Sequence, residues 1–494
     1  MSVSLPTSIG PQSRQSVRLE RVPELDGLAP IDVAERIRPA GGMALLESGR
    51  PGRNARWTYL SADPRLVLNR PSDGPDPFAG ARLTLARLAD GPPQALASRG
   101  DVRPPGAAAR AAGDEPSFLG GLVGHLSYDI GRRFERLPAI AVDDQPLPIL
   151  RLQVHDWVLA HDRRDGHWWI GGRAMDGDVA RLEDRLAAAR ELALRGRRPD
   201  ATGDRPSGLR VLEFRSGLER PAYEAAVQAV RAAIERGELY QANVTRRLEA
   251  SFEGDPWLVY RRLRTGDPAL FAAFLPLEAG PVAGRAIVSA SPEPFLSITA
   301  RGLVASDPIK GTRPRGRDRA EDRRLARELL SSAKDRAENV MIVDVLRNDL
   351  GRVCIPGTVR VPRLCRLERT TAVQHLVSTV TGRLRPGLGP FDLLAAAFPG
   401  GSITGAPKIR AMQLLEGLEP VRRGPYTGAA GWIGADGAMQ TSILIRTFVA
   451  DGERLTLHVG GGITWRSDPG EEWQETVDKA RGPLSAIGGH EVPS

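Results

Sequence analysis

The sequence predicts an α+β protein built mainly from antiparallel sheets. Helical and strand-like segments are interleaved along the 494 residues without the regular strand–helix–strand spacing of a parallel sheet. Apolar residues make up 41% and charged residues 26%, as in an ordinary globular chain, and the length allows about three domains or one large composite domain. No stretch approaches about 18 uninterrupted apolar residues, so we expect no membrane-spanning helix.

The best internal boundary is a polar, turn-rich stretch after residue 195, RGRRPDATGDRPSG. Before it, alternating apolar and polar residues predict strands at 150–162 and 167–174 and a helix at about 177–195. We therefore divide the chain into a disordered lead-in (1–17), an N-terminal region (18–195), a linker (196–210) and a second region (211–488).

The second region begins with the clearest helix of the chain, at 221–238. Pro221 lies in its first turn, Gly237 ends it, and apolar residues recur on one face at three- and four-residue spacing. Further helices are expected at about 320–333, 335–348, 391–397, 408–417 and 471–486, and strands at about 239–252, 285–300, 358–367, 375–383, 428–435, 441–450 and 454–461.

Composition excludes several classes of function. Basic residues number 68 and acidic residues 60, but acids and bases alternate and aromatics are only 5%, which argues against a nucleic-acid binder. The chain has only two cysteines, which argues against a disulfide framework. Its start lacks the charged segment followed by an apolar one that marks a signal peptide, so we expect a cytoplasmic protein. Only four of the 68 basic residues are lysines (Lys310, Lys334, Lys408 and Lys479), so each one is informative.

Lys310 lies between an apolar strand end and a Gly-Thr turn in DPIKGTRPRG. It could bind an anion together with Arg313 and Arg315, or these guanidinium groups and burial could lower its pKa and make it a nucleophile. Glu293, in SASPEPF, is placed between a strand and a proline as a general acid could be, although a plain strand-end carboxylate is the commoner case.

Two glycine-rich loops could hold a carboxylate through free backbone N–H groups, or could be purely structural turns. FPGGSITGAPKIRA (398–411) is not a phosphate-binding P-loop, because its lysine does not directly follow the second glycine, and HVGGGI spans 458–463. Arg446 interrupts the β-branched run SILIRTFV and needs a partner if buried, for which a substrate carboxylate is one candidate. His375, in an apolar strand, is by default a core histidine.

Two glutamates point to a cation. Glu338 heads a nearly all-apolar helical segment, where an unpaired carboxylate is costly. Glu475 is either a ligand or the partner of Lys479 in a solvated ion pair. Carboxylates from distant segments, without a cysteine or histidine cluster, suit Mg²⁺ completed by water and substrate oxygens, and there is no zinc pattern.

Together these segments resemble the chorismate-utilising enzymes. PIKGTRPRG, AKDRAENVMIVDVLRNDLGRV, HLVSTVTG, FPGGSITGAPKIRAM, TSILIRT, GGGI and WQETVDK occur in the family's order, within a similarity that runs from about residue 40 to 486. The resemblance implies two mostly antiparallel sheets packed together with helices outside. It also implies an N-terminal region like that of anthranilate synthase component I, followed by a chorismate-binding catalytic domain at 211–488.

Within the family, Lys310 indicates the branch. PIKGT is typical of aminodeoxychorismate synthase component I, whereas anthranilate synthase component I, the alternative, usually has alanine at this position. Gln241, in ELYQANVTRR, matches the ammonia-using members, since the water-using isochorismate and salicylate synthases have a lysine base there. The resemblance thus implies amination of chorismate to 4-amino-4-deoxychorismate, toward 4-aminobenzoate and folate, with Lys310 adding at ring C2 and Glu293 as general acid.

The resemblance also assigns the remaining site residues. Glu338 and Glu475 match Mg²⁺ ligands, and Thr312 and His375 match positions near the ring. Substrate-binding positions are matched by Gln241, Gly405, Lys408, Tyr426, Arg446, Gly461 and Gly462, and a possible tryptophan pocket by Leu46, Glu47 and Ser48.

The chain carries no glutaminase signature of its own. Cys354 and Cys365 lack the flanking glycines of a nucleophile elbow. We therefore expect ammonia to arrive free or from glutamine through a separate glutamine amidotransferase subunit in a heterodimer, with no nucleic-acid or membrane partner.

Overall fold

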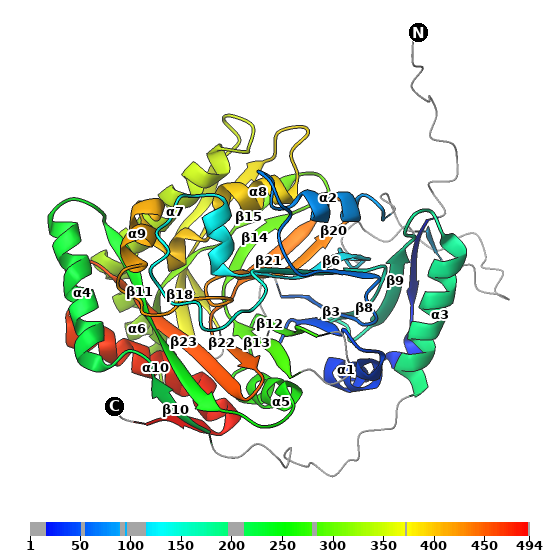
Figure 1. Cartoon of the computed structure of the whole chain (residues 1–494), viewed down its shortest axis with the longest axis horizontal. Coiled ribbons are helices and arrows are strands. Elements are labelled where there is room, and N and C mark those ends of the chain that lie inside the picture. Colours follow the sequence, from blue (N-terminus) through cyan, green and yellow to red (C-terminus); the bar gives the residue numbers. More distant parts are fainter. Residues whose placement is uncertain are drawn as a thin grey trace, which may run out of the picture.

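Two large sheets pack face to face and helices cover their outer surfaces (Figure 1), which confirms the predicted α+β class. The computed structural model describes residues 16–50, 55–88, 94–95, 115–195, 212–278, 284–370 and 373–492. Almost all strand pairings are antiparallel; among the described residues the parallel ones are β1 with β5, β10 with β24, and one isolated bridge.

The first sheet contains fourteen strands among the described residues. Their order is β24 (Gly489–Glu491), β10 (Leu212–Ser216), β11 (Gln241–Ser251), β23 (Arg454–Ile463), β22 (Thr447–Asp451), β13 (Arg285–Ser291), β12 (Phe271–Pro276), β2 (Ala44–Glu47), β3 (Trp57–Ser61), β8 (Trp157–Asp162), β9 (Trp168–Arg173), β1 (Val17–Arg21) and β5 (Gln94–Ala95), and β19 (Gly405–Ala406) pairs with β11.

The second sheet contains ten strands in the same part of the chain. Their order is β16 (Ile309–Pro314), β18 (Val373–Arg383), β15 (Leu303–Ser306), β14 (Pro294–Ile298), β21 (Met439–Ile443), β20 (Ala429–Gly434), β6 (Gly121–Leu126), β7 (Leu150–His155) and β4 (Leu66–Leu68), and β17 (Arg360–Arg369) pairs with β18.

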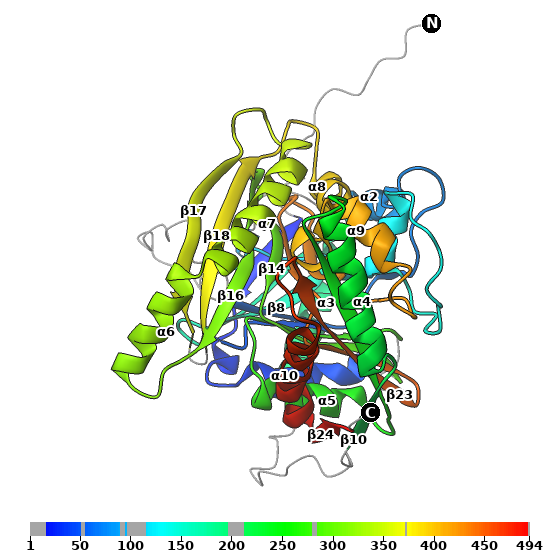
Figure 2. The ribbon, with the colours of Figure 1, turned by 90° about the vertical axis from the view of Figure 1, so that its left-hand side faces the viewer.

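The helices lie on both outer faces. They are α1 (Pro30–Ile37), α2 (Ala79–Leu85), α3 (Val179–Arg195), α4 (Arg220–Glu235), α5 (Pro256–Gly266), α6 (Arg319–Ser331), α7 (Ala333–Gly351), α8 (Pro390–Ala397), α9 (Lys408–Leu415) and α10 (Pro469–Ile487). Figure 2 shows α7 lying along β16 and β18, and α6 at the lower left, next to the same strands.

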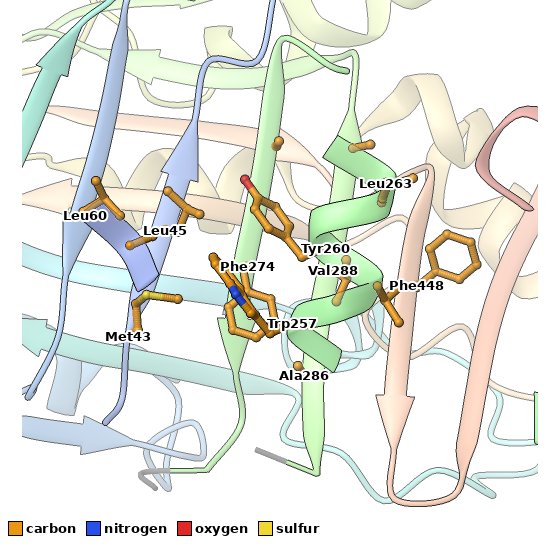
Figure 3. Close-up of a cluster of buried hydrophobic side chains, with 14 of the residues drawn as sticks. Met43, Leu45, Leu60, Trp257, Tyr260, Leu263, Phe274, Ala286, Val288 and Phe448 are labelled. Carbon is orange, nitrogen blue, oxygen red and sulfur yellow. The ribbon is translucent and has the colours of Figure 1, made fainter. Parts of the chain in front are cut away.

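Strict alternation along the central strands explains the layers. In β12 and β13, Phe274 and Val288 face the helix side, whereas Leu275 and Ile287 face the second sheet. Figure 3 shows the helix-side cluster, in which Trp257 and Tyr260 of α5 pack on Phe274. Burial of each of these large side chains contributes about 2–3 kcal/mol.

Two predicted strands are broken in the structure, and each break produces a candidate site residue. The segment 285–300 divides into β13 and β14 at a corner that carries Glu293. The segment 441–450 divides into β21 and β22 around Arg446, whose backbone adopts a positive φ of 49°. The sequence prediction also missed α5 and β12.

The N-terminal region (18–195) and the second region (211–488) both contribute strands to both sheets. β1, β2 and β3 extend the sheet that holds β11–β13, and β6 and β7 extend the sheet that holds β20 and β21. Most of the lead-in (1–15) and the linker (196–210) lie outside the described residues. No helix in the described part of the chain is both long and apolar enough to span a bilayer.

Candidate active site

Lys310 and Glu293 meet at Ser402, in the turn Gly401–Ile403. The Nζ of Lys310, on β16, donates a hydrogen bond to the Ser402 carbonyl oxygen at 3.1 Å. Glu293 is buried and accepts hydrogen bonds from the Ser402 side chain and from the backbone of Ile309. Burial raises the pKa of the Glu293 carboxyl, although the Lys310 charge and these hydrogen bonds oppose the shift. The carboxyl therefore keeps its proton to higher pH than a free glutamate, as a general acid requires.

The Gln241 side chain lies next to Lys310 across Gly462. Gln241 begins β11 and is fully buried, and neither its amide nitrogen nor its amide oxygen has a hydrogen-bond partner among the described residues. A Cβ on Gly462 would collide with Nε2 of Gln241 and would lie 3.7 Å from Nζ of Lys310. With glycine at position 462, the unpartnered Gln241 amide and the Lys310 side-chain nitrogen line the same small space. An unpaired buried amide is costly, and a ligand that hydrogen-bonds to it would offset that cost.

Gly405, in the glycine-rich loop 398–411, lies against β11, the strand that begins with Gln241. It pairs with Ala242 through β19, and its φ of 150° is one that a side chain would rarely adopt. A Cβ there would collide with the carbonyl oxygen of Gln241. The loop 398–407 can therefore lie against the start of β11 only with glycine at this position.

Glu338 of α7 lies near Glu475 of α10, and Glu475 and Glu472 lie against Gly461. The Oε1 of Glu338 (α7) and the Oε2 of Glu472 (α10) are buried without a hydrogen-bond partner in the described part of the chain. A Cβ on Gly461 would lie 2.8 Å from Oε2 of Glu472 and 3.7 Å from Oε1 of Glu475. Burial raises the pKa of Glu338, and the charge of Glu475 adds to that increase.

These carboxylates fit a hard cation. Orphaned carboxylate oxygens beside a glycine are suitable ligands for Mg²⁺, which prefers oxygen. No group of three or more histidine, cysteine, aspartate or glutamate side chains forms a complete metal site within the described residues. Other oxygens would therefore have to complete the coordination. Glu475 also forms the expected ion pair with Lys479 at 2.7 Å, and its side chain is 47% exposed.

Thr312, His375 and Arg446 form a second group of neighbouring candidate residues. The Thr312 hydroxyl and Nδ1 of His375 are 2.9 Å apart on the paired strands β16 and β18. Burial, aided by the charges of Arg446 and Arg50, lowers the pKa of His375 to about 4. His375 is therefore neutral near pH 7. The half-exposed Arg446 lies near it and contacts Asp267 at 3.4 Å.

Two predicted substrate-binding residues have partners of their own. The Nζ of Lys408 pairs with Asp349 at 2.8 Å and donates to the Ala397 carbonyl at 2.7 Å, so the structure does not bring it to Lys310. The buried ring of Tyr426 stacks on His458, with ring centroids 5.0 Å apart. Substrate contact by either residue stays a prediction.

Leu46, Glu47 and Ser48 line a pocket between the two sheets, together with Trp57, Tyr59 and Trp432 among others. The pocket has about 370 Å³ of space, including the part open to solvent. The Glu47 carboxylate is already bound by the Tyr260 hydroxyl at 2.6 Å and by Arg264. Trp432 is buried, and its Nε1 has no hydrogen-bond partner among the described residues.

Sequence reasoning missed several residues of the site. Ser402 lies inside a motif that was recognised. The i, i+3 spacing places Glu472 on the same helix face as Glu475, but nothing in the sequence assigned Glu472 a role in the site. Asp267 and Arg50 lie in segments without a motif, and only the fold brings them to Arg446.

Comparison with known proteins agrees with this geometry. A family model of chorismate binding enzymes matches residues 79–485. The chain is 43% identical over 363 residues to aminodeoxychorismate synthase component 1 of Salmonella typhimurium, covering 73% of this chain and 75% of that protein. It is 39% identical over 445 residues to anthranilate synthase component 1 of Thermus thermophilus, covering 90% and 91%.

Solved structures are similar over most of the chain. Anthranilate synthase component I from Streptococcus pneumoniae superposes with a TM-score of 0.73 at 29% identity, covering 88% of this chain and 93% of that one. MenF, the menaquinone-specific isochorismate synthase from Escherichia coli, superposes with a TM-score of 0.69 at 16% identity, covering 96% and 94%, and shares the fold. The predicted architecture of two packed sheets with outer helices is thereby confirmed.

Proposed function

This chain belongs to the family of chorismate binding enzymes, and we propose that it uses ammonia to convert chorismate to 4-amino-4-deoxychorismate. The observation that carries this proposal is the position of Lys310, next to the buried acid Glu293 and the unpartnered amide of Gln241. A lysine beside a carboxyl of raised pKa suits nucleophilic attack coupled to loss of a hydroxyl. The similarity to aminodeoxychorismate synthase component 1 of Salmonella typhimurium supports the same reaction.

In the proposed reaction, the free amine of Lys310 adds to ring C2 while the C4 hydroxyl leaves as water, with Glu293 supplying the proton. The ring double bonds shift from C1–C2 and C5–C6 to C1–C6 and C4–C5. Ammonia then adds at C4, the double bonds shift back, the C2–N bond to Lys310 breaks and the lysine amine is regenerated, while a proton from the incoming nitrogen returns to Glu293. The covalent intermediate thus divides one difficult substitution into two easier steps.

Glu338 and Glu475 would hold Mg²⁺, and Glu472 lies beside Glu475. When bound, Mg²⁺ would neutralise and orient the ring carboxylate. Arg446 and the backbone N–H groups near Gly405, Gly461 and Gly462 would bind the carboxylates, and the Gln241 amide faces the space next to Lys310. The Thr312–His375 pair would contact the ring.

Ammonia would come from a separate glutamine amidotransferase subunit in the cytoplasm, on the route to 4-aminobenzoate and folate. Both cysteines of this chain are buried, and burial raises the pKa of Cys354, so neither suits a glutaminase nucleophile. Free ammonium salt should replace the subunit in vitro.

The tryptophan pocket is part of the proposal. The aromatic walls and Ser48 would suit an indole ring. Calorimetric titration with tryptophan should show binding that phenylalanine does not match, and the absence of any heat would remove this assignment.

The second candidate is the anthranilate-forming reaction, which also releases pyruvate. It is favoured by the relative from Thermus thermophilus, which matches 90% of this chain. Lys310 speaks against it, because the family resemblance associates that reaction with alanine at this position.

The test is incubation of the full chain with chorismate, Mg²⁺ and excess ammonium salt, followed by chromatography and mass analysis. Aminodeoxychorismate that an added lyase converts to 4-aminobenzoate would establish the reaction, and the control without ammonium should give none. Anthranilate with pyruvate would replace the proposal by the second candidate. If chorismate is still intact after the glutaminase subunit is supplied, both are wrong.

A further inference from the structure

The Asp267 carboxylate lies between two guanidinium groups at the rim of the candidate site. The Nη1 of Arg446 is 3.4 Å from Oδ1 and 3.5 Å from Oδ2 of Asp267. The Nη2 of Arg50 is also 3.4 Å from Oδ1, and Nε of Arg50 donates to the Pro268 carbonyl. All three Asp267 distances exceed the usual length of a charge-assisted hydrogen bond, about 2.7–2.9 Å. Asp267 therefore holds each arginine only loosely.

Backbone contacts place all three residues near one another. Asp267 ends α5 and its N–H donates to the Leu263 carbonyl at 2.8 Å. Gly49 lets Arg50 approach, since a Cβ there would lie 2.8 Å from the Ala269 carbonyl oxygen. Arg446 has a positive φ of 49°, and its own carbonyl accepts a hydrogen bond from Ala290 at 3.0 Å. Asp267 and Arg446 are thus held by backbone hydrogen bonds, and Arg50 follows a glycine that lies close against Ala269.

The charges at this place do not balance internally. A carboxylate at a helix C-terminus is unfavourable unless cations offset it, so Asp267 depends on its arginines. Two guanidinium groups share one carboxylate, and the Arg446 side chain is 42% exposed whereas those of Arg50 and Asp267 are only 16% and 13% exposed. The excess positive charge is therefore most accessible to solvent at Arg446. The charges of both arginines also reach His375, where they add to burial in lowering its pKa.

We propose that Asp267 is a positioning residue for Arg446, and that Arg50, by sharing the Asp267 carboxylate, keeps Arg446 available to a substrate carboxylate. This inference rests on the proposed function, in which Arg446 binds chorismate. Without Asp267, Arg446 loses its guide and is repelled by Arg50. Without Arg50, Asp267 can form a close bidentate pair with Arg446 and compete with the substrate.

The test compares Asp267→Asn and Arg50→Gln with the wild type by calorimetric titration of chorismate and by steady-state kinetics. Both variants should weaken chorismate binding and raise KM about tenfold, the loss expected when one charge-assisted contact is misplaced, while kcat changes less than about twofold. Arg50→Lys, which keeps the charge, should recover most of the affinity. Asp255→Asn is the matched control, because Asp255 caps the other end of α5 and pairs with Arg38, away from the site.

The outcomes separate the two proposals. If the wild type binds chorismate and both variants bind it equally well, the positioning role is wrong and the proposed function stands. The positioning role is also wrong if Asp255→Asn weakens binding as much as Asp267→Asn, or if kcat falls while KM is unchanged. If Asp267→Asn does not fold, Arg50→Gln and Arg50→Lys still decide the question. If the wild type does not bind chorismate, the proposed function fails and this inference fails with it.

Discussion

Lys310 and Glu293 share one neighbour, Ser402, whose carbonyl accepts from the lysine and whose side chain donates to the glutamate. Lys310 lies on β16 and Glu293 at the corner before β14. Ser402, in the turn Gly401–Ile403, contacts both of them. A nucleophile and a proton donor held this way can act on two carbons of one six-membered ring.

Lys310→Ala should lower aminodeoxychorismate formation at least about 100-fold and leave the fold intact. The fold should survive because the lysine side chain is only half-buried and its amine makes a single backbone contact. Ammonia-dependent product formation and a thermal melt measure the two effects. Lys310→Arg keeps the positive charge without the nucleophile and should be equally inactive. An unchanged rate would refute the covalent role of the lysine.

The Glu293 carboxyl should set the alkaline limb of the pH–rate profile. The protonated acid is the active form, so the rate falls as pH rises through its pKa, which burial has raised. The hydrogen bond from the Ser402 side chain stabilises the charged form. Removing it in Ser402→Ala should therefore raise the pKa further and move the limb to higher pH. Glu293→Gln should be slow and lack the limb. A limb that stays in place in both variants would assign it to another group.

Elements with strong periodicity could be predicted from sequence, and those interrupted for function could not. The helix at 221–238 corresponds to α4 because its apolar spacing, proline start and glycine stop all agree. The strands 285–300 and 441–450 were expected to be continuous because local propensity does not register a corner. Arg446 has a positive φ at the corner between β21 and β22, where its carbonyl accepts a hydrogen bond from Ala290 of β13. The missed helix α5 did have a signal, Asp255 as N-cap before Pro256.

Glu338→Gln should raise the half-saturating Mg²⁺ concentration by about 10- to 100-fold, because one of two expected charged ligands is lost. Mg²⁺ should also raise the melting temperature of the wild type in the absence of substrate, and much less that of the variant. Glu471→Gln, exposed at the start of α10, is the matched control. Equal Mg²⁺ dependence in wild type and Glu338→Gln would mean that the metal binds elsewhere.

The chemistry of the site was easier to predict than its geometry. Residues inside motifs, such as Lys310 and Gln241, could be named because their segments carry the family pattern. Ser402 lies in such a motif too, but its contact with both Lys310 and Glu293 depends on a turn that brings together residues about 100 positions apart. Asp267 and Arg50 have no motif, and their meeting depends on the pairing of β2 with β12.

Gln241→Met should stabilise the protein and impair amination. Both amide atoms of Gln241 are buried without a partner among the described residues, so an apolar side chain of similar size should increase the free energy of unfolding by about 1–3 kcal/mol. Gln374→Met is the opposite control, because the Gln374 amide nitrogen, unlike that of Gln241, donates to Asp322 and the loss of these bonds should destabilise the fold. Denaturant unfolding and the ammonia-dependent rate measure the two effects. A destabilised Gln241→Met would show that the amide has a partner, such as an ordered water.

His125 should make the protein sensitive to acid. It is buried in β6 with Nε2 3.0 Å from the Pro148 carbonyl oxygen, and burial lowers its pKa from 6.5 to about 4. The unfolded chain therefore binds the extra proton first as pH falls. The stability contributed by the neutral ring is complete above pH 6.5 and is lost between pH 6.5 and about 4, by about 2 kcal/mol at pH 5.

His125→Gln should consequently have a lower free energy of unfolding than the wild type at pH 7. At pH 5 the difference between the two proteins should be smaller by about 2 kcal/mol, because only the wild type loses the stability of the neutral His125 ring as the pH falls. Urea unfolding at the two pH values measures the change. His490→Gln, at an exposed position, should follow the wild type at both values. Parallel curves for wild type and His125→Gln would show that the ring is already charged in the fold, or that its proton is not linked to unfolding.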